Sequence, residues 1–122
     1  VHCLMARLLR RRAPVIMDAT NLLRRHREAV YGIAGECGVP LLVLRIVAPP
    51  QVVRRRLERR SAAGGGQDYP TAPWEVYLRM RGVAEPICRQ HHVIDTAHDL
   101  GPAIDRFVAV VKGAVAQEER KR

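Results

Sequence analysis

A carboxylate, a hydroxyl and an amide stand together after an apolar run in the sequence VIMDATN, residues 15–21. The apolar run is typical of a buried strand, so Asp18, Thr20 and Asn21 would lie just beyond the carboxyl end of that strand. In parallel sheets, ligands bind at that edge. The three polar residues are therefore candidates for a binding site.

Arginine supplies nearly all of the positive charge. The chain has 19 Arg and 2 Lys among its 122 residues, and its formal net charge is +9. A planar guanidinium can donate two parallel hydrogen bonds to one anion, so an arginine-rich surface suits phosphate. The alternative is that many of the arginines reflect a GC-rich genome, and then the net charge is weak evidence for nucleic-acid binding.

Apolar segments alternate with amphipathic segments along the chain. The expected strands are residues 14–18, 41–47 and 91–95, and the expected helices are residues 4–12, 22–37, 49–60, 73–82 and 100–115. This alternation predicts an α/β fold, with a parallel sheet flanked by helices. We expect one domain, residues 1–122, with residues 117–122 as a frayed tail.

Polar residues also follow the third expected strand. Asp95 and Thr96 come directly after the apolar residues of HHVID, residues 91–95. Because the carboxyl ends of parallel strands meet at one edge of a sheet, we expect Asp95 and Thr96 to share a crevice with Asp18.

In their order and spacing, several motifs resemble the second half of a P-loop kinase. They are VIMDATN, Arg27 in the following helix, APPQVVRRRLERR (residues 48–60), EPI (85–87) and HHVIDT (91–96). The resembled family is the ATP-binding one that includes the polynucleotide 5′-hydroxyl kinases and AAA-type kinase-like domains. The resemblance implies a P-loop NTPase-like fold, ATP and Mg²⁺ as cofactors, and phosphoryl transfer to a hydroxyl acceptor.

The resemblance also implies roles for the candidate residues. Asp18 would position Mg²⁺ through water or orient the acceptor hydroxyl, unless it only caps the following turn. Thr20 and Asn21 would contribute to the same phosphate and metal site. Arg56 and Arg60 are four residues apart and would project from one helical face, where they would neutralise the charge of the transferring phosphoryl group.

Other positions keep two interpretations. Arg27 would contact substrate or form a surface salt bridge, and Asp95 and Thr96 would border the adenine largely through their backbone. The glycine-rich segment 61–72 would be a lid or an ordinary surface loop. Trp74 and Tyr77 would stack a base or pack in the core.

The sequence departs from the family at one important motif. It contains no GxxxxGK[ST], since Gly64–Gly66 is followed by Gln67 and Asp68. We therefore expect the C-terminal portion of a P-loop kinase domain, incomplete at the N-terminus, with a gap or a compensating rearrangement in its sheet. The alternatives are a relative without a P-loop and a non-catalytic module that binds nucleic acid or protein.

The cellular context follows from what the sequence contains. Cys3, Cys37 and Cys88 are odd in number and widely spaced, which fits a reducing compartment better than a disulfide framework. No secretory signal or apolar run of membrane-spanning length is present. We expect a cytoplasmic protein whose partners are ATP and an acceptor that the sequence does not identify.

Overall fold

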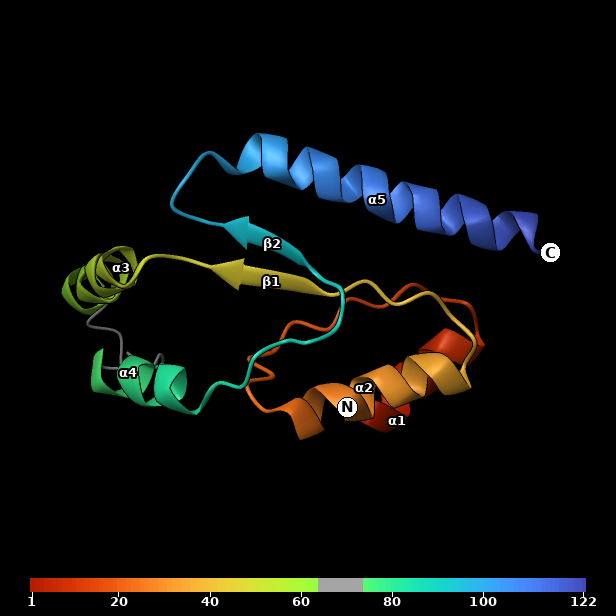
Figure 1. Cartoon of the computed structure of the whole chain (residues 1–122), viewed down its shortest axis with the longest axis horizontal. Helices are drawn as coiled ribbons and strands as arrows, with labels where there is room; N and C mark the ends of the chain where they lie inside the picture. Colours follow the sequence, from red (N-terminus) through yellow and green to blue (C-terminus); the bar gives the residue numbers. More distant parts are fainter. Residues whose placement is uncertain (64–73) are drawn as a thin grey trace.

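Two short parallel strands form the sheet in the computed structural model, which describes residues 1–63 and 74–122. Strand β1 (Leu44–Val47) pairs with β2 (His92–Asp95), in a register that places Leu44 beside His92 and Val47 beside Asp95 (Figure 1). Backbone bonds of 2.9 Å continue the ladder at both ends, from His92 N to the Val43 oxygen and from Thr96 N to the Val47 oxygen. The two later strands predicted from the sequence are confirmed, with β1 shorter than expected.

The first expected strand, residues 14–18, is not part of the sheet in the described structure. Ile16 is 96% exposed, whereas a buried strand would cover it. The prediction was wrong here because a strand needs the peptide groups of a neighbour, which none of the described residues supplies. In Figure 1 the chain between α1 and α2 runs in the same direction as β1 but does not join it.

Five helices surround this sheet in the described residues: α1 (His2–Arg10), α2 (Arg24–Glu36), α3 (Pro50–Ala63), α4 (Trp74–Val83) and α5 (Leu100–Arg120). Pro50 opens α3, where its missing N–H leaves no bond unmade. Asp99 caps α5 by accepting a 3.1 Å bond from Gly101 N. Helix α5 continues to Arg120, through most of the segment expected to fray.

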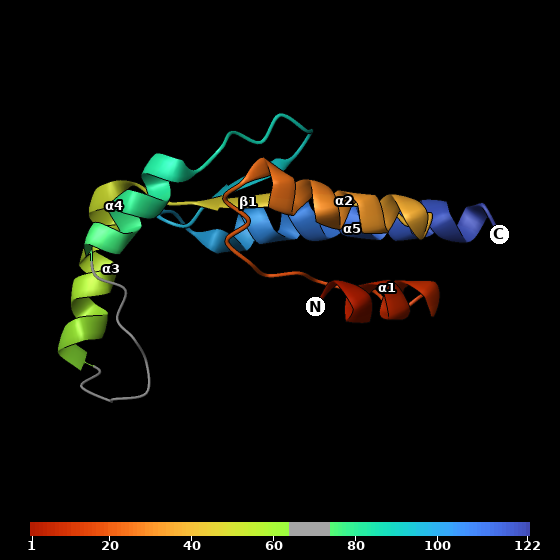
Figure 2. The same cartoon turned by 90° about the horizontal axis from the view of Figure 1, so that it is seen from below.

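The helices fall into two groups. Figures 1 and 2 both show α3 and α4 together at the end toward which β1 points, away from α1, α2 and most of α5. Helix α5 packs on β2, with Phe107 edge-on to His92 at 5.5 Å between ring centroids. Helix α1 packs on α2. The carboxyl ends of the strands therefore face α3.

The sheet is only partly covered. In the described residues, the buried apolar side chains are Met5, Ala34 and Ile94, while Ile46 is 58% and Val93 is 55% exposed. A parallel sheet normally has both faces covered. The architecture is thus an α/β fold of the P-loop-like type, partly incomplete, as predicted.

Within the described part of the chain, no helix is both long enough and apolar enough to cross a membrane. Cys3, Cys37 and Cys88 are free thiols.

Candidate functional site

Three predicted site residues meet where the two strands end. Arg56 in α3 donates from Nη1 to Thr96 Oγ1 and from Nη2 to the Thr96 carbonyl oxygen, both at 2.7 Å. The Thr96 hydroxyl in turn donates to the Val47 carbonyl oxygen at 3.3 Å. Asp95 Oδ1 accepts from Ala97 N at 2.9 Å, which tightens the turn after β2. Arg56 thus ties α3 to the ends of both strands.

Arg60 lies one helical turn beyond Arg56 and is exposed. No hydrogen bond or ion pair to the described residues engages its side chain. The side chain of Arg54, on the same helix, does have partners. Its Nε pairs with Glu58 Oε1 at 3.2 Å, and its Cζ lies 5.5 Å from the centroid of the Trp74 ring. Arg60 can therefore donate to an anion without first breaking a contact to the described residues.

Replacing Thr96 with Val should lower the free energy of unfolding by about 1 kcal/mol, because it removes one acceptor of Arg56 and the bond to Val47. Thermal unfolding of the variant measures this loss. Thr20→Val is the matched control, because Thr20 is exposed and its hydroxyl has no partner among the described residues. Equal losses in the two variants would contradict a stabilising role for the hydrogen bonds that join Arg56, Thr96 and Val47.

The acid within VIMDATN is exposed to solvent. Asp18 and Thr20 are exposed, and neither side chain makes a hydrogen bond to the described residues. Asn21 has φ of 42°, in the left-handed region that asparagine tolerates better than most residues. Helix α2 begins at Arg24 with Leu23 as its N-cap, so neither Asp18 nor Asn21 caps it. Asn21 is a plausible N-cap by its residue type, but Leu23 holds that position because α2 begins at Arg24.

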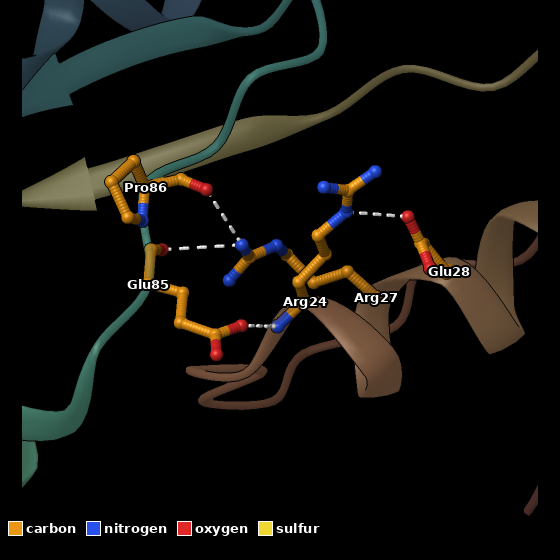
Figure 3. A network of polar contacts seen from close by, with 5 residues as sticks. All are labelled: Arg24, Arg27, Glu28, Glu85 and Pro86. Atoms are coloured by element: carbon orange, nitrogen blue, oxygen red, sulfur yellow. Dashed lines mark hydrogen bonds and ion pairs between the residues drawn. The ribbon is translucent and has the colours of Figure 1, made fainter.

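The sequence left two interpretations for Arg27, a substrate contact or a surface salt bridge, and the structure shows a third arrangement. Its side chain is buried, at 7% exposure, so it makes no surface salt bridge. Nη1 donates to the carbonyl oxygens of Asn21 at 2.8 Å and Leu22 at 2.9 Å, and Nη2 donates to those of Glu85 at 3.1 Å and Pro86 at 2.8 Å. Figure 3 shows the guanidinium between α2 and the chain that follows α4. Both terminal nitrogens are engaged within the protein.

Glu85 is a structural residue to which the sequence alone assigned no role. Its backbone N donates to the Leu22 carbonyl oxygen at 2.9 Å, and its Oε2 accepts from Arg24 N at 2.5 Å (Figure 3). Leu23, the N-cap residue of α2, has no side-chain acceptor. The carboxylate of Glu85, 61 residues from Arg24, caps the first turn of α2 instead. The signal available in the sequence was the EPI motif, which carries this acid but does not reveal its partner.

Arg24 also pairs with Glu28 on the outside of α2 at 2.6 Å. This hydrogen bond is the main reason that the pKa of Arg24 is raised above its usual value. Both side chains are exposed, so the pair adds little to stability.

The aromatic residues of α4 stack on each other. The rings of Trp74 and Tyr77 are 4.9 Å apart and both side chains are half-buried. An open groove between α3 and α4 is lined by Arg54, Leu57, Glu58 and Trp74, among others. The expected lid, residues 61–72, lies outside the described residues except for the last turn of α3.

The described side chains fit Mg²⁺ only as in a kinase site, where the protein itself supplies few of the metal ligands. In the described residues, no three of His, Cys, Asp and Glu gather as a metal-binding group. Magnesium kinase sites use one or two carboxylates, with water and the substrate phosphates completing the shell. An exposed Asp18 that makes no hydrogen bond to the described residues is compatible with that arrangement.

A family profile described as "AAA domain" matches residues 1–87. The chain belongs to this AAA-domain family. No curated protein and no solved structure matches the chain significantly. The matched range includes Asp18, Arg27, Arg56, Arg60 and Glu85, and it ends before β2.

Membership in this family supports relationship to the P-loop NTPases and AAA-type kinases. It also supports a general nucleotide-binding, kinase-like character. Proteins of this type generally bind nucleotide together with Mg²⁺.

Proposed function

We propose that this AAA-domain protein takes part in ATP- and Mg²⁺-dependent phosphoryl transfer to a hydroxyl acceptor. The observation that carries the proposal is the placement of α3. Arg56 is bonded to Thr96 at the carboxyl ends of the strands, and Arg60 is exposed one turn further along the same helix. The ends of parallel strands are where this kind of fold binds its ligands.

Phosphoryl transfer needs little covalent chemistry from the protein, because positioning and charge neutralisation provide most of the acceleration. In this proposal Arg60 donates to the β- and γ-phosphates, while Arg56 holds α3 and shares in neutralising the phosphate charge. Asp18 orients the metal through water or orients the acceptor hydroxyl. Thr20 and Asn21 belong to the same turn, and Asp95 and Thr96 border the nucleotide. Bound Mg²⁺ would offset the negative charge of the phosphates.

Two classes of phosphoryl acceptor fit this proposal: a nucleic-acid 5′-hydroxyl and the hydroxyl of a small metabolite. The many exposed arginines favour the first, and the diversity of acceptors among kinase-like domains favours the second. Screening both classes for transfer of labelled γ-phosphate distinguishes them.

A second candidate function is a non-catalytic nucleic-acid-binding module. It is favoured by the exposed arginines of α3 and by Arg54 lying over Trp74 beside Tyr77. Such a module would bind single-stranded oligonucleotide without ATP, and its affinity would fall steeply with salt. A GxxxxGK[ST] motif encoded upstream in the same reading frame would favour the kinase instead.

Calorimetric titration of the 122-residue chain with Mg·ATP tests the first proposal. We expect saturable heat in the micromolar to millimolar range, and its loss when Mg²⁺ is chelated. The control is circular dichroism on the same sample, which establishes that the chain is folded. A folded chain that gives no heat contradicts ATP binding by this segment alone, and the titration is then repeated with the residues encoded upstream included.

A further inference from the structure

The buried guanidinium of Arg27 joins two parts of the chain that are far apart in the sequence. Two of its acceptors, the Asn21 and Leu22 oxygens, belong to the turn that follows Asp18. The other two, the Glu85 and Pro86 oxygens, belong to the connection between α4 and β2. All four acceptors are main-chain oxygens, so the bonds fix the backbone of both segments.

Glu85 adds two further bonds between the same segments. Its N–H donates to Leu22, and its carboxylate accepts from the N–H of Arg24. The start of α2, the turn before it and residues 85–86 therefore form one hydrogen-bonded unit, which we name the Arg27 clamp. It comprises Asn21, Leu22, Arg24, Arg27, Glu85 and Pro86.

The chemistry of the clamp is specific to arginine. A guanidinium presents its donors in a planar fork, whereas a lysine ammonium is a compact, strongly hydrated charge. Burying a charge among neutral oxygens carries a desolvation cost. An apolar side chain of similar volume would avoid that cost, but it would leave four carbonyl oxygens without these bonds and would not set the distance between the segments.

The position of the clamp determines what it controls. Asn21 lies three residues after Asp18, and its left-handed backbone precedes the start of α2. On the other side, Glu85 lies two residues beyond the end of α4, at Val83. The clamp therefore connects the chain just after α4 to the segment between Asp18 and α2.

We propose that Arg27 is a positioning residue that couples the Asp18–Asn21 turn to the connection following α4. This role needs no contact with substrate or metal, because the side chain is buried and its two terminal nitrogens already donate four bonds within the protein. The consequence for catalysis rests on the proposed function. The coupling itself does not, and it can be measured without nucleotide.

Amide hydrogen exchange of Arg27→Met in the 122-residue chain tests the coupling. The amides of Arg24 and Glu85 should exchange at least ~10-fold faster than in the unsubstituted chain, because their acceptors lie in the clamp. The Thr96 amide, bonded to Val47, and the amides of α5 should keep their protection. Arg25→Met is the matched control, since Arg25 is exposed on the same helix.

Unchanged exchange at Arg24 and Glu85 would overturn the proposal. So would an increase of equal size throughout α5, which would make Arg27 a residue of general stability only. If Arg27→Met does not fold, Arg27→Lys replaces it, since lysine keeps the charge but lacks the fork. The same local increase is expected there, and protection equal to that of arginine would overturn the assignment.

Mg·ATP titration of the same variants separates the two proposals. If the unsubstituted chain binds no Mg·ATP while Arg27→Met shows the local increase, ATP binding by this segment alone fails and the clamp stands. If the unsubstituted chain binds Mg·ATP and exchange is unchanged in the variant, the clamp fails alone.

Discussion

Arg60→Ala should lower the rate of phosphoryl transfer by about 10³-fold while leaving most of the ATP affinity in place, because an arginine of this kind acts mainly on the transition state. Charge develops on the transferring phosphoryl group, and a guanidinium that gains its strongest contact there raises the rate more than the affinity. Arg60 is placed for such a role because it is exposed on α3, one turn beyond the residue that anchors the helix at Thr96. The measurement is transfer of labelled γ-phosphate, in the form of the protein that binds Mg·ATP.

Arg59→Ala is the control for this result. Arg59 is also exposed on α3, but it is not on the row formed by Arg56 and Arg60. Both variants remove one positive charge, so a general electrostatic effect would lower the two rates alike. Equal rates in Arg60→Ala and the unsubstituted protein would remove the assignment of Arg60.

Asp18→Asn should lower Mg²⁺-dependent phosphoryl transfer by about 10²- to 10³-fold and leave the fold intact. The substitution keeps the size of the side chain and removes its charge, so it weakens the attraction to a hydrated metal ion or to an acceptor hydroxyl. Because the Asp18 side chain is exposed and has no hydrogen bond to the described residues, the unfolding temperature should not change. The rate is measured across a titration of Mg²⁺.

Asp105→Asn, an exposed position on α5, is the matched control for loss of one carboxylate. An Asp18→Asn protein with full activity and a lower unfolding temperature would mean that Asp18 only stabilises the chain around it and has no role in phosphoryl transfer. A rate that falls equally at all Mg²⁺ concentrations would instead favour orientation of the acceptor hydroxyl over positioning of the metal.

Local patterns in the sequence were sufficient for most of the secondary structure. The near-continuous apolar run at residues 41–47 identified β1, and the short segment HHVID identified β2. Pro50 marked the beginning of α3, and the apolar stripe after Asp99 identified α5. These features depend on the period of apolar residues and on the geometry of individual residues, which act over a few positions. The spacing of Arg56 and Arg60 belongs to the same class, because one helical turn places both on one face.

Local sequence patterns were not sufficient for the segment at residues 14–18, which was expected to form a strand. Its apolar composition is that of a strand, yet Ile16 is exposed and the segment makes no ladder with the described residues. A strand exists only where a neighbour pairs with it, and no local pattern reveals whether that neighbour is present.

The sequence by itself determined the order of the helices and of the two paired strands, the arginine row on α3 and the polar residues beyond β2. Only the tertiary structure decided that Arg27 is buried as a clamp, that Glu85 caps α2 and that Arg56 is bonded to Thr96. The physical reason is that main-chain oxygens accepted the Arg27 bonds, and such acceptors have no sequence signature. Which distant backbone meets a side chain is set by how the helices and strands pack.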